Sequence, residues 1–181
     1  MKENSWSWVK MQKYTRLATK NDISNIMLSI DDAIAFLKQS GSTQWQNGYP
    51  NQKVIEEDIA NKNGYVFVVG NQIASYAAVI EGIEPTYQKI DGSWHNERDP
   101  YATTHRICFS SNYQGQGLAK IFISNIVSLE LSRGIRNLRV DTHRLNIPMQ
   151  TLAEHNGFKY RGIIQCNDEV DPDRSAYELN L

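Results

Sequence analysis

A short glycine-containing stretch, Tyr-Gln-Gly-Gln-Gly-Leu-Ala-Lys at residues 113–120, constrains the fold of this chain more than any other segment. It lies between an apolar run at 105–109, which predicts a strand, and an apolar-periodic segment at 118–133, which predicts a helix. Two glycines at such a junction leave backbone N–H groups uncovered by side chains. Because unpaired donors and the helix dipole at a helix N-terminus favour an anion, we expect residues 114–120 to hold a phosphate-bearing ligand.

The composition excludes several classes of protein. A length of 181 residues predicts one domain with its own core, and a net charge of −1 gives no basic surplus for nucleic acid. The two cysteines, Cys108 and Cys166, indicate neither a disulfide framework nor a zinc site, and no other metal site is expected. The sequence shows no signal-peptide pattern and no apolar run of about 18 residues. We therefore expect a cytoplasmic protein without a membrane partner.

The order of predicted elements indicates an α+β fold with a mixed sheet, antiparallel early and with a helical crossover later. Residues 1–13 show no period and predict a tail, whereas 81–104 predict an irregular segment that is functional or contains an extra hairpin. The remaining strands are predicted at 14–18, 65–69, 73–80, 138–142, 158–164 and 176–179, and the remaining helices at 22–41, just after 50, and at 149–155.

Three interpretations of Gly115-Gln116-Gly117 follow from the residues themselves. A Walker phosphate loop requires Gly-x-x-x-x-Gly-Lys-Ser/Thr, which is absent. A dinucleotide fingerprint requires a third small residue where Lys120 stands, although Asp141 does end a predicted strand about 20 residues later. The third interpretation is a strand–helix turn that merely needs glycine, and the residues alone leave it as open as an anion site.

Two motifs at a characteristic separation resemble a known family. Gln114-x-x-Gly117-x-Ala119 resembles the Gln/Arg-x-x-Gly-x-Gly/Ala signature of the GNAT-type N-acetyltransferase superfamily. Asn146, eleven residues before Gly157-Phe158, resembles the next block of that superfamily, an Asn that opens a helix ending in Gly-Phe. The resemblance extends over 14–181 in element order.

The resemblance implies a single GNAT-like acyl-CoA N-acyltransferase domain at 14–181, with 81–104 as a long acceptor-side insertion. Its central, mostly antiparallel sheet would splay between the motif strand and the next and would be flanked by helices. The implied activity moves an acetyl group from acetyl-CoA, a co-substrate, to a primary amine of a small molecule, amino acid or peptide, by direct attack in a ternary complex and without a metal.

The resemblance also implies which residues bind acetyl-CoA. Its pyrophosphate would lie on backbone amides of the glycine stretch, and its pantetheine arm would pair with the motif strand like an added strand. Asn146 would hydrogen-bond the arm, or would simply cap its helix. The residues so implied are Ile107, Cys108, Phe109, Gln114, Gly115, Gln116, Gly117, Leu118, Ala119, Lys120 and Asn146.

Amine acetylation requires a base, an oxyanion donor and protonation of the leaving thiolate. We expect a backbone N–H at Phe109 or a neighbour to be the donor. His105, on the motif strand, is the first candidate for the base because imidazoles titrate near neutral pH, and His143 is the second. Each histidine could instead have no catalytic role. The position from which a family Tyr protonates the thiolate is Ala153, so this general acid is missing.

The acceptor pocket is expected between the 41–50 loop and the 81–104 insertion. Trp45 and Tyr49 would stack on an amine or would only anchor their loop, and Glu81 and Glu84 would face the acceptor. Because Ala153 lacks a hydroxyl, an acyl-CoA-binding protein with a regulatory role and little transferase activity is the alternative function. A protein-interaction module using the tail and aromatic loops is a third. The oligomeric state is open, a homodimer included.

Overall fold

The computed structural model describes residues 11–181, so most of the expected tail, residues 1–10, lies outside the described part of the chain. The helices are α1 (Ile23–Gln39), α2 (Gln52–Ala60), α3 (Leu118–Ser132) and α4 (Ile147–His155), with 3₁₀ turns η1 (Lys20–Asp22), η2 (Pro85–Tyr87) and η3 (Ser111–Tyr113). The strands are β1 (Lys13–Leu17), β2 (Gly64–Val69), β3 (Gln72–Glu81), β4 (Ile90–Gly92), β5 (Tyr101–Phe109), β6 (Asn137–Thr142), β7 (Lys159–Gln165) and β8 (Asp173–Asn180).

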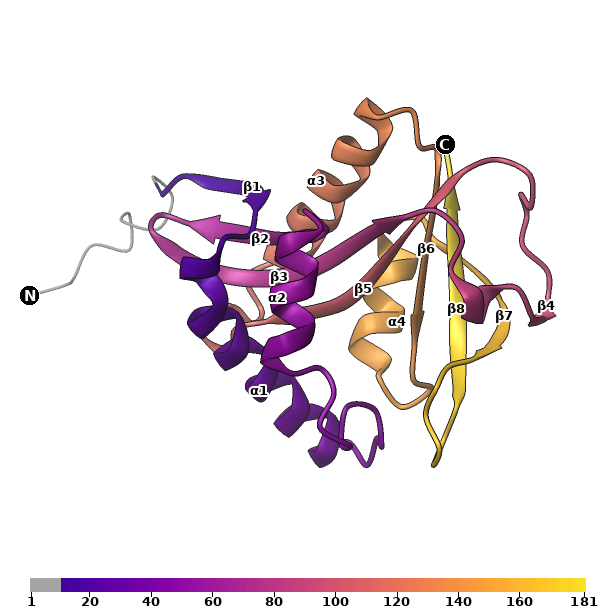
Figure 1. Cartoon of the computed structure of the whole chain (residues 1–181), viewed down its shortest axis with the longest axis horizontal. Coiled ribbons are helices and arrows are strands. Elements are labelled where there is room, and N and C mark those ends of the chain that lie inside the picture. The colour runs from indigo at the N-terminus through magenta and orange to yellow at the C-terminus, as the bar shows by residue number, and fades with distance from the viewer. Residues whose placement is uncertain (1–10) are drawn as a thin grey trace, which may run out of the picture.

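These strands form one sheet in the order β1-β2-β3-β5-β6-β8-β7-β4. The β5–β6 pair is parallel and the other neighbouring pairs are antiparallel. In Figure 1, β2 and β3 run across the view whereas β6 and β8 stand nearly upright, so the sheet is strongly twisted. The predicted α+β class with a mixed, mostly antiparallel sheet is confirmed.

The sheet opens between β5 and β6, as predicted. The two strands pair only from Tyr101↔Asn137 to Thr103↔Arg139. Beyond these residues β5 continues along β3 as far as Phe109, and β6 continues along β8 as far as Thr142. The inner edges of both strands are therefore free of a β-ladder where they diverge, which leaves room for an extended ligand.

Apolar periodicity places helices on both faces of this sheet. On one face, α3 and α4 bury a cluster that includes Phe67, Phe122 and Leu138. On the other face, α1 and α2 bury a second cluster that includes Ile26 and Tyr76. Burial of these side chains, worth roughly 1.5–3 kcal/mol for each large apolar group, holds the two halves of the opened sheet in place.

The 81–104 segment differs most from its prediction as an irregular insertion. It contains η2 and β4, and its last residues, from Tyr101, already belong to β5, because this β-branched run pairs with the end of β3. The guanidinium of Arg139 lies 4.0 Å from the Trp94 ring centroid and 3.9 Å from that of Tyr101, and it pairs with buried Glu178. This stack fixes the segment against the sheet.

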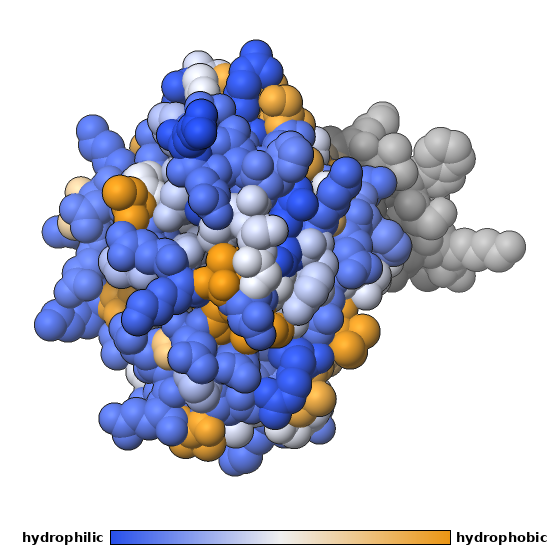
Figure 2. Space-filling view, turned by 90° about the vertical axis from the view of Figure 1, so that its right-hand side faces the viewer, coloured by the Kyte–Doolittle hydropathy of each residue, from blue (hydrophilic) through white to orange (hydrophobic). Residues whose placement is uncertain are grey.

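Two negative findings apply to residues 11–181. No helix there is long and apolar enough to cross a membrane. No group of His, Cys, Asp or Glu in this part of the chain is arranged to hold a metal ion. The face on the right-hand side of Figure 1, which Figure 2 presents, is mostly hydrophilic, and its hydrophobic residues form small separate patches.

Candidate active site

A cleft of about 1190 Å³ lies where β5 and β6 diverge. Its walls come from several separate parts of the chain: the end of α1 with the loop after it, the end of β3 with Glu84 and Thr86, β5, the glycine stretch with the start of α3, the end of β6 with α4, and residues 166–168 with Arg174. The cleft therefore joins the predicted anion site to the predicted acceptor loops in one continuous space.

The glycine stretch presents bare backbone to this cleft. Gly115 and Gly117 have φ values of +73° and +70°, and a Cβ built on either would meet no atom within 4 Å. Gly117 is the N-cap of α3 and supplies no side-chain cap. Among the turn and cap hydrogen bonds of the described chain, none starts from the N–H of Gly115, Gln116 or Gly117. This helix N-terminus can therefore take an anion.

Not every residue of the stretch faces the cleft. Gln116 and Lys120 do not line it, and the side-chain amide of Gln116 donates to the Asn112 carbonyl at 3.3 Å. The residues of the stretch that line the cleft are Tyr113, Gln114, Gly115, Gly117, Leu118 and Ala119.

The ladder between β3 and β5 decides where the β5 amides point. The Ser110 N–H donates to the Ala74 carbonyl at 3.0 Å, and the next pair along the strands is Phe109↔Ser75. Because inward and outward pairs alternate in an antiparallel ladder, the N–H of Phe109 points away from β3. It therefore faces the opening towards β6. Ile107, Cys108 and Phe109 all line the cleft.

His105 lies in the cleft wall as half of an imidazole–carboxylate pair. Its Nε2 lies 3.1 Å from Oε2 of Glu84, and both side chains are about one-fifth exposed. The pKa of Glu84 is lowered to about 2, mainly by the hydrogen bond from His105. Burial acts in the opposite direction with a smaller effect. An ionised Glu84 only accepts hydrogen bonds, so it favours the tautomer with hydrogen on Nε2 and the lone pair on Nδ1.

His143 forms a similar pair in a different setting. Its Nε2 lies 3.0 Å from Asp171, while its Nδ1 accepts the N–H of Leu145 at 3.2 Å. Its side chain is 1% exposed and does not line the cleft. Because both ring nitrogens are engaged, this geometry does not support His143 as a base.

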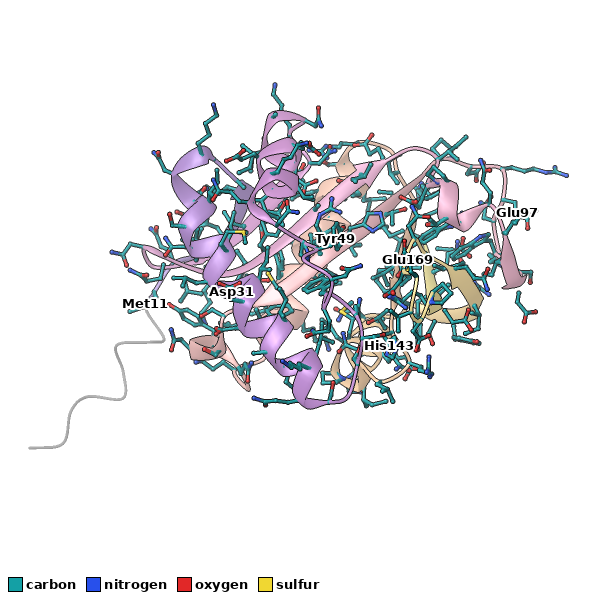
Figure 3. All side chains as sticks on the ribbon, turned by 60° about the horizontal axis from the view of Figure 1, so that its bottom comes forward. Met11, Asp31, Tyr49, Glu97, His143 and Glu169 are labelled. Carbon is teal, nitrogen blue, oxygen red and sulfur yellow. The ribbon has the colours of Figure 1, made fainter. Side chains whose placement is uncertain are left out.

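Like the two histidines, the predicted acceptor residues include some that line the cleft and one that does not. Trp45, Tyr49 and Glu84 line the cleft, whereas Glu81 does not and lies 3.4 Å from Arg133. Trp45 and Tyr49 come from the loop after α1, where Figure 3 shows Tyr49. The glutamates differ because Glu81 still belongs to β3, whereas Glu84 follows the turn at Gly82.

Several charged cleft residues were missed as site residues, Asp141 and Arg106 among them. Asp141 lines the cleft and accepts the Tyr87 hydroxyl at 2.7 Å; sequence analysis noted its strand-end position only for a dinucleotide fingerprint. Arg106 also lines the cleft and pairs with Asp58 on α2. The available signal for Arg106 was a charged residue inside the apolar run at 105–109.

The family model for "Acetyltransferase (GNAT) family" matches residues 34–158, more than half of the chain. The chain belongs to the GNAT acetyltransferase family. The match includes the loop after α1, the 81–104 segment, the glycine stretch and α4. A comparison with curated proteins finds no significant match.

Solved GNAT structures share the whole fold. An acetyltransferase of the GNAT family from Streptococcus agalactiae 2603 is 36% identical, with a TM-score of 0.85 over 93% of this chain and 95% of that chain. One from Listeria monocytogenes 4b F2365 is 22% identical, with a TM-score of 0.71 over 93% and 95%. RimL, a ribosomal L7/L12 α-N-protein acetyltransferase in complex with coenzyme A, is 16% identical, with a TM-score of 0.67 over 93% and 94%. The latter two bear on the fold alone.

The second GNAT-like block, at α4, makes structural contacts in this chain. The Oδ1 of Asn146 accepts the Met149 N–H at 3.4 Å, so the side chain caps the helix while it also lines the cleft. Ala153 is 3% exposed and packs into the core beneath α4. Cys108 is also core: burial raises the pKa of its thiol to about 12, which disfavours a reactive thiolate.

Proposed function

We propose that this GNAT protein is an N-acetyltransferase that moves the acetyl group of acetyl-CoA to a primary amine by direct attack in a ternary complex. One observation carries the proposal. The uncovered amides at Gly115–Gly117 and the His105–Glu84 pair open onto the same cleft, at the point where β5 and β6 part. The same cleft can therefore bind an anionic acetyl carrier and supply a base that deprotonates the acceptor amine.

Acetyl-CoA would bind along the opening as a co-substrate. Its pyrophosphate would accept hydrogen bonds from the backbone at 114–120, where the helix dipole of α3 favours negative charge. Its arm would pair with the free inner edge of β5 at 107–109, as a β-strand adds to a sheet edge. The thioester carbonyl would then lie near the outward N–H of Phe109, which is the proposed oxyanion donor.

His105 would remove the proton from the attacking ammonium. Glu84 holds its Nε2–H, so Nδ1 accepts the proton, directly or through a water. The neutral amine then forms a C–N bond to the thioester carbon and its nitrogen gives up a second proton to solvent. The C–S bond breaks, and the coenzyme leaves as a thiolate. Because Ala153 offers no acid, the thiolate takes its proton from solvent, which a good leaving group tolerates. Neither Glu81 nor His143 takes part in this proposal.

The acceptor end of the cleft favours a positively charged amine. Two cleft arginines are already neutralised, Arg106 by Asp58 and Arg174 by Asp168. Within the described chain, neither Asp141 nor Glu84 has an Arg or Lys within 4 Å, and the only ion-pair partner of Glu84 there is His105. These two carboxylates would attract a cationic acceptor, and the aromatic rings of Trp45 and Tyr49 would pack against it.

Release of free thiol from acetyl-CoA in the presence of a panel of small amines, amino acids and peptides tests this function. Amine-dependent release, with the acetylated product seen by mass spectrometry, supports it. Tight acetyl-CoA binding without release by any amine would instead support the alternative, an acyl-CoA-binding protein with a regulatory role. No thermal stabilisation by acetyl-CoA at millimolar concentration would contradict both. A cytoplasmic location and a homodimer remain expectations beside this proposal.

A further inference from the structure

We infer that Arg106 is a positioning residue: its ion pair with Asp58 holds the β5 bulge that aims the outward amides of β5 at the thioester. The inference rests on the proposed function, because the aimed amide at Phe109 matters only if an acyl group is transferred. It goes beyond that function because Arg106 contacts Asp58 on α2 and would influence the reaction only by fixing the backbone of the residues that follow it in β5.

The β3–β5 ladder shifts register at Arg106. Tyr76 lies opposite Cys108 and Ala78 opposite His105, so two β5 residues face the single residue Ala77. This is a β-bulge, which bends the strand and redirects the residues that follow. Arg106 has a φ of +56°, in the left-handed region that side chains with a Cβ disfavour. The bulge therefore needs an interaction that offsets its backbone cost.

The bulge also changes which face each side chain takes. His105 lies opposite Ala78, which packs with the α1–α2 cluster, so His105 is on the α2 side of the sheet. The next residue, Arg106, points to the same side, where it pairs with Asp58. After this break in alternation, Ile107 and Phe109 pack with the α3 cluster, and Cys108 packs with the α1–α2 cluster. Without the bulge, either His105 or the pair Ile107 and Phe109 would turn to the opposite face.

The interaction that offsets the cost is a buried, two-pronged ion pair. The Nε and Nη2 of Arg106 donate to the two oxygens of Asp58 at 2.8 and 2.6 Å, and the two side chains are 9% and 7% exposed. The Tyr76 hydroxyl donates to the same carboxylate at 2.7 Å. Such geometry is specific to arginine and fixes the side chain in one direction.

The same guanidinium reaches the acceptor loop. Its Nη1 donates to the Tyr49 hydroxyl at 2.6 Å, and Tyr49 lines the cleft. Figure 3 shows Tyr49 on the loop after α1. Arg106 thus connects α2, the acceptor loop and the strand that would hold the thioester. Its loss should reduce the rate of transfer more than the binding of either substrate.

The test compares two variants that lose the same ion pair. Arg106→Ala keeps a Cβ and should leave the left-handed conformation, whereas Arg106→Gly can keep that conformation without help. We expect kcat for the best amine of the panel to fall about tenfold in R106A and to stay within about threefold in R106G. Both variants should lose thermal stability, since both leave Asp58 unpaired.

Asp58→Asn provides a second test without changing residue 106. It weakens the pair, so kcat should fall as in R106A, and adding Arg106→Gly to it should restore kcat. If R106G is as slow as R106A, or if R106A has the wild-type kcat, the inference is wrong. Crystal structures of the two single variants check it independently of activity: R106G should keep the bulge and R106A should lose it, and the reverse would overturn the inference.

The two proposals can fail separately. If wild-type protein releases no thiol with any amine, the proposed function fails, whereas the structures of R106A and R106G still decide whether the ion pair holds the bulge. If wild-type protein is active and both variants keep the bulge and the rate, only the role of Arg106 is rejected.

Discussion

The cleft has two walls that are built in opposite ways. One wall, called here the carrier wall, consists of 107–109 and 114–119, two nearby segments that present backbone groups. The other, the acceptor wall, consists of Trp45, Tyr49, Glu84, His105 and Asp141, whose side chains come from distant parts of the chain and, apart from Trp45, are engaged in hydrogen bonds or ion pairs.

Because the two walls are built differently, they recognise different features of the two substrates. Backbone donors at a helix N-terminus suit any ligand with phosphates, so the carrier wall selects a chemical class. The acceptor wall depends on the placement of a few charges, and each charge can be lost or moved by one substitution. We therefore expect variants of the carrier wall to change acetyl-CoA binding alone, and variants of the acceptor wall to change rate or acceptor choice.

The largest effect is expected on the carrier wall. Gly117→Val places a β-branched side chain at a φ of +70° and projects it into the proposed phosphate site. The loss of two or more charged hydrogen bonds should weaken acetyl-CoA binding about a hundredfold or more, measured by calorimetry. Gly134→Val is the matched control, at a φ of +86° with equally open space after the other end of α3. It should cost stability and leave binding unchanged; equal weakening by both would contradict the phosphate site.

The next effect is expected at the base. His105→Gln should lower kcat about a hundredfold and leave the dissociation constant of acetyl-CoA unchanged, because it removes a proton acceptor from the acceptor wall only. Steady-state thiol release measures kcat. His143→Gln removes the similar imidazole–carboxylate pair outside the cleft. A loss of kcat in His143→Gln as large as in His105→Gln would break the distinction between the two histidines.

A smaller effect is expected on acceptor choice. The wild-type protein should acetylate 1,4-diaminobutane more efficiently than 1-aminobutane, because the second ammonium is attracted by Asp141. Asp141→Asn should reduce this preference in kcat/KM about tenfold, since one charged contact is lost. Glu81→Gln, at a carboxylate outside the cleft, should leave the preference unchanged. A preference for the monoamine in the wild-type protein would show that the acceptor wall does not select charge.

The smallest effect is expected in the pH dependence of stability. His105 lowers the pKa of Glu84 to about 2 from its ordinary value of 4.5. A lowered carboxyl pKa adds stability above the ordinary value, and that stability is lost as pH falls towards about 2. Wild-type protein should therefore exceed Glu84→Gln in free energy of unfolding by about 1 kcal/mol at pH 6, and urea titrations should show the gap narrowing below pH 4.5. A gap independent of pH would mean that the pair does not stabilise the fold electrostatically.

The carrier wall was predictable because its causes are local. A strand, two glycines and an apolar-periodic helix follow one another within 105–133, and positive φ at Gly115 and Gly117 requires no distant partner. The same locality explains why most helices and strands were placed within a few residues. The start of β5 at Tyr101 was missed because it depends on pairing with β3, which local propensity does not encode.

The sequence alone determined the α+β class, the glycine stretch between a strand and a helix, and the family motifs, since each depends on periodicity or on residues close in the chain. Only the tertiary structure decided that His105 meets Glu84, that His143 is sealed behind Asp171 and Leu145, and that Arg106 sits in a bulge. The physical reason is that hydrogen bonds and burial depend on which distant segments pack together. Two histidines of equal chemistry thus acquire different surroundings, and only the surroundings assign them different roles.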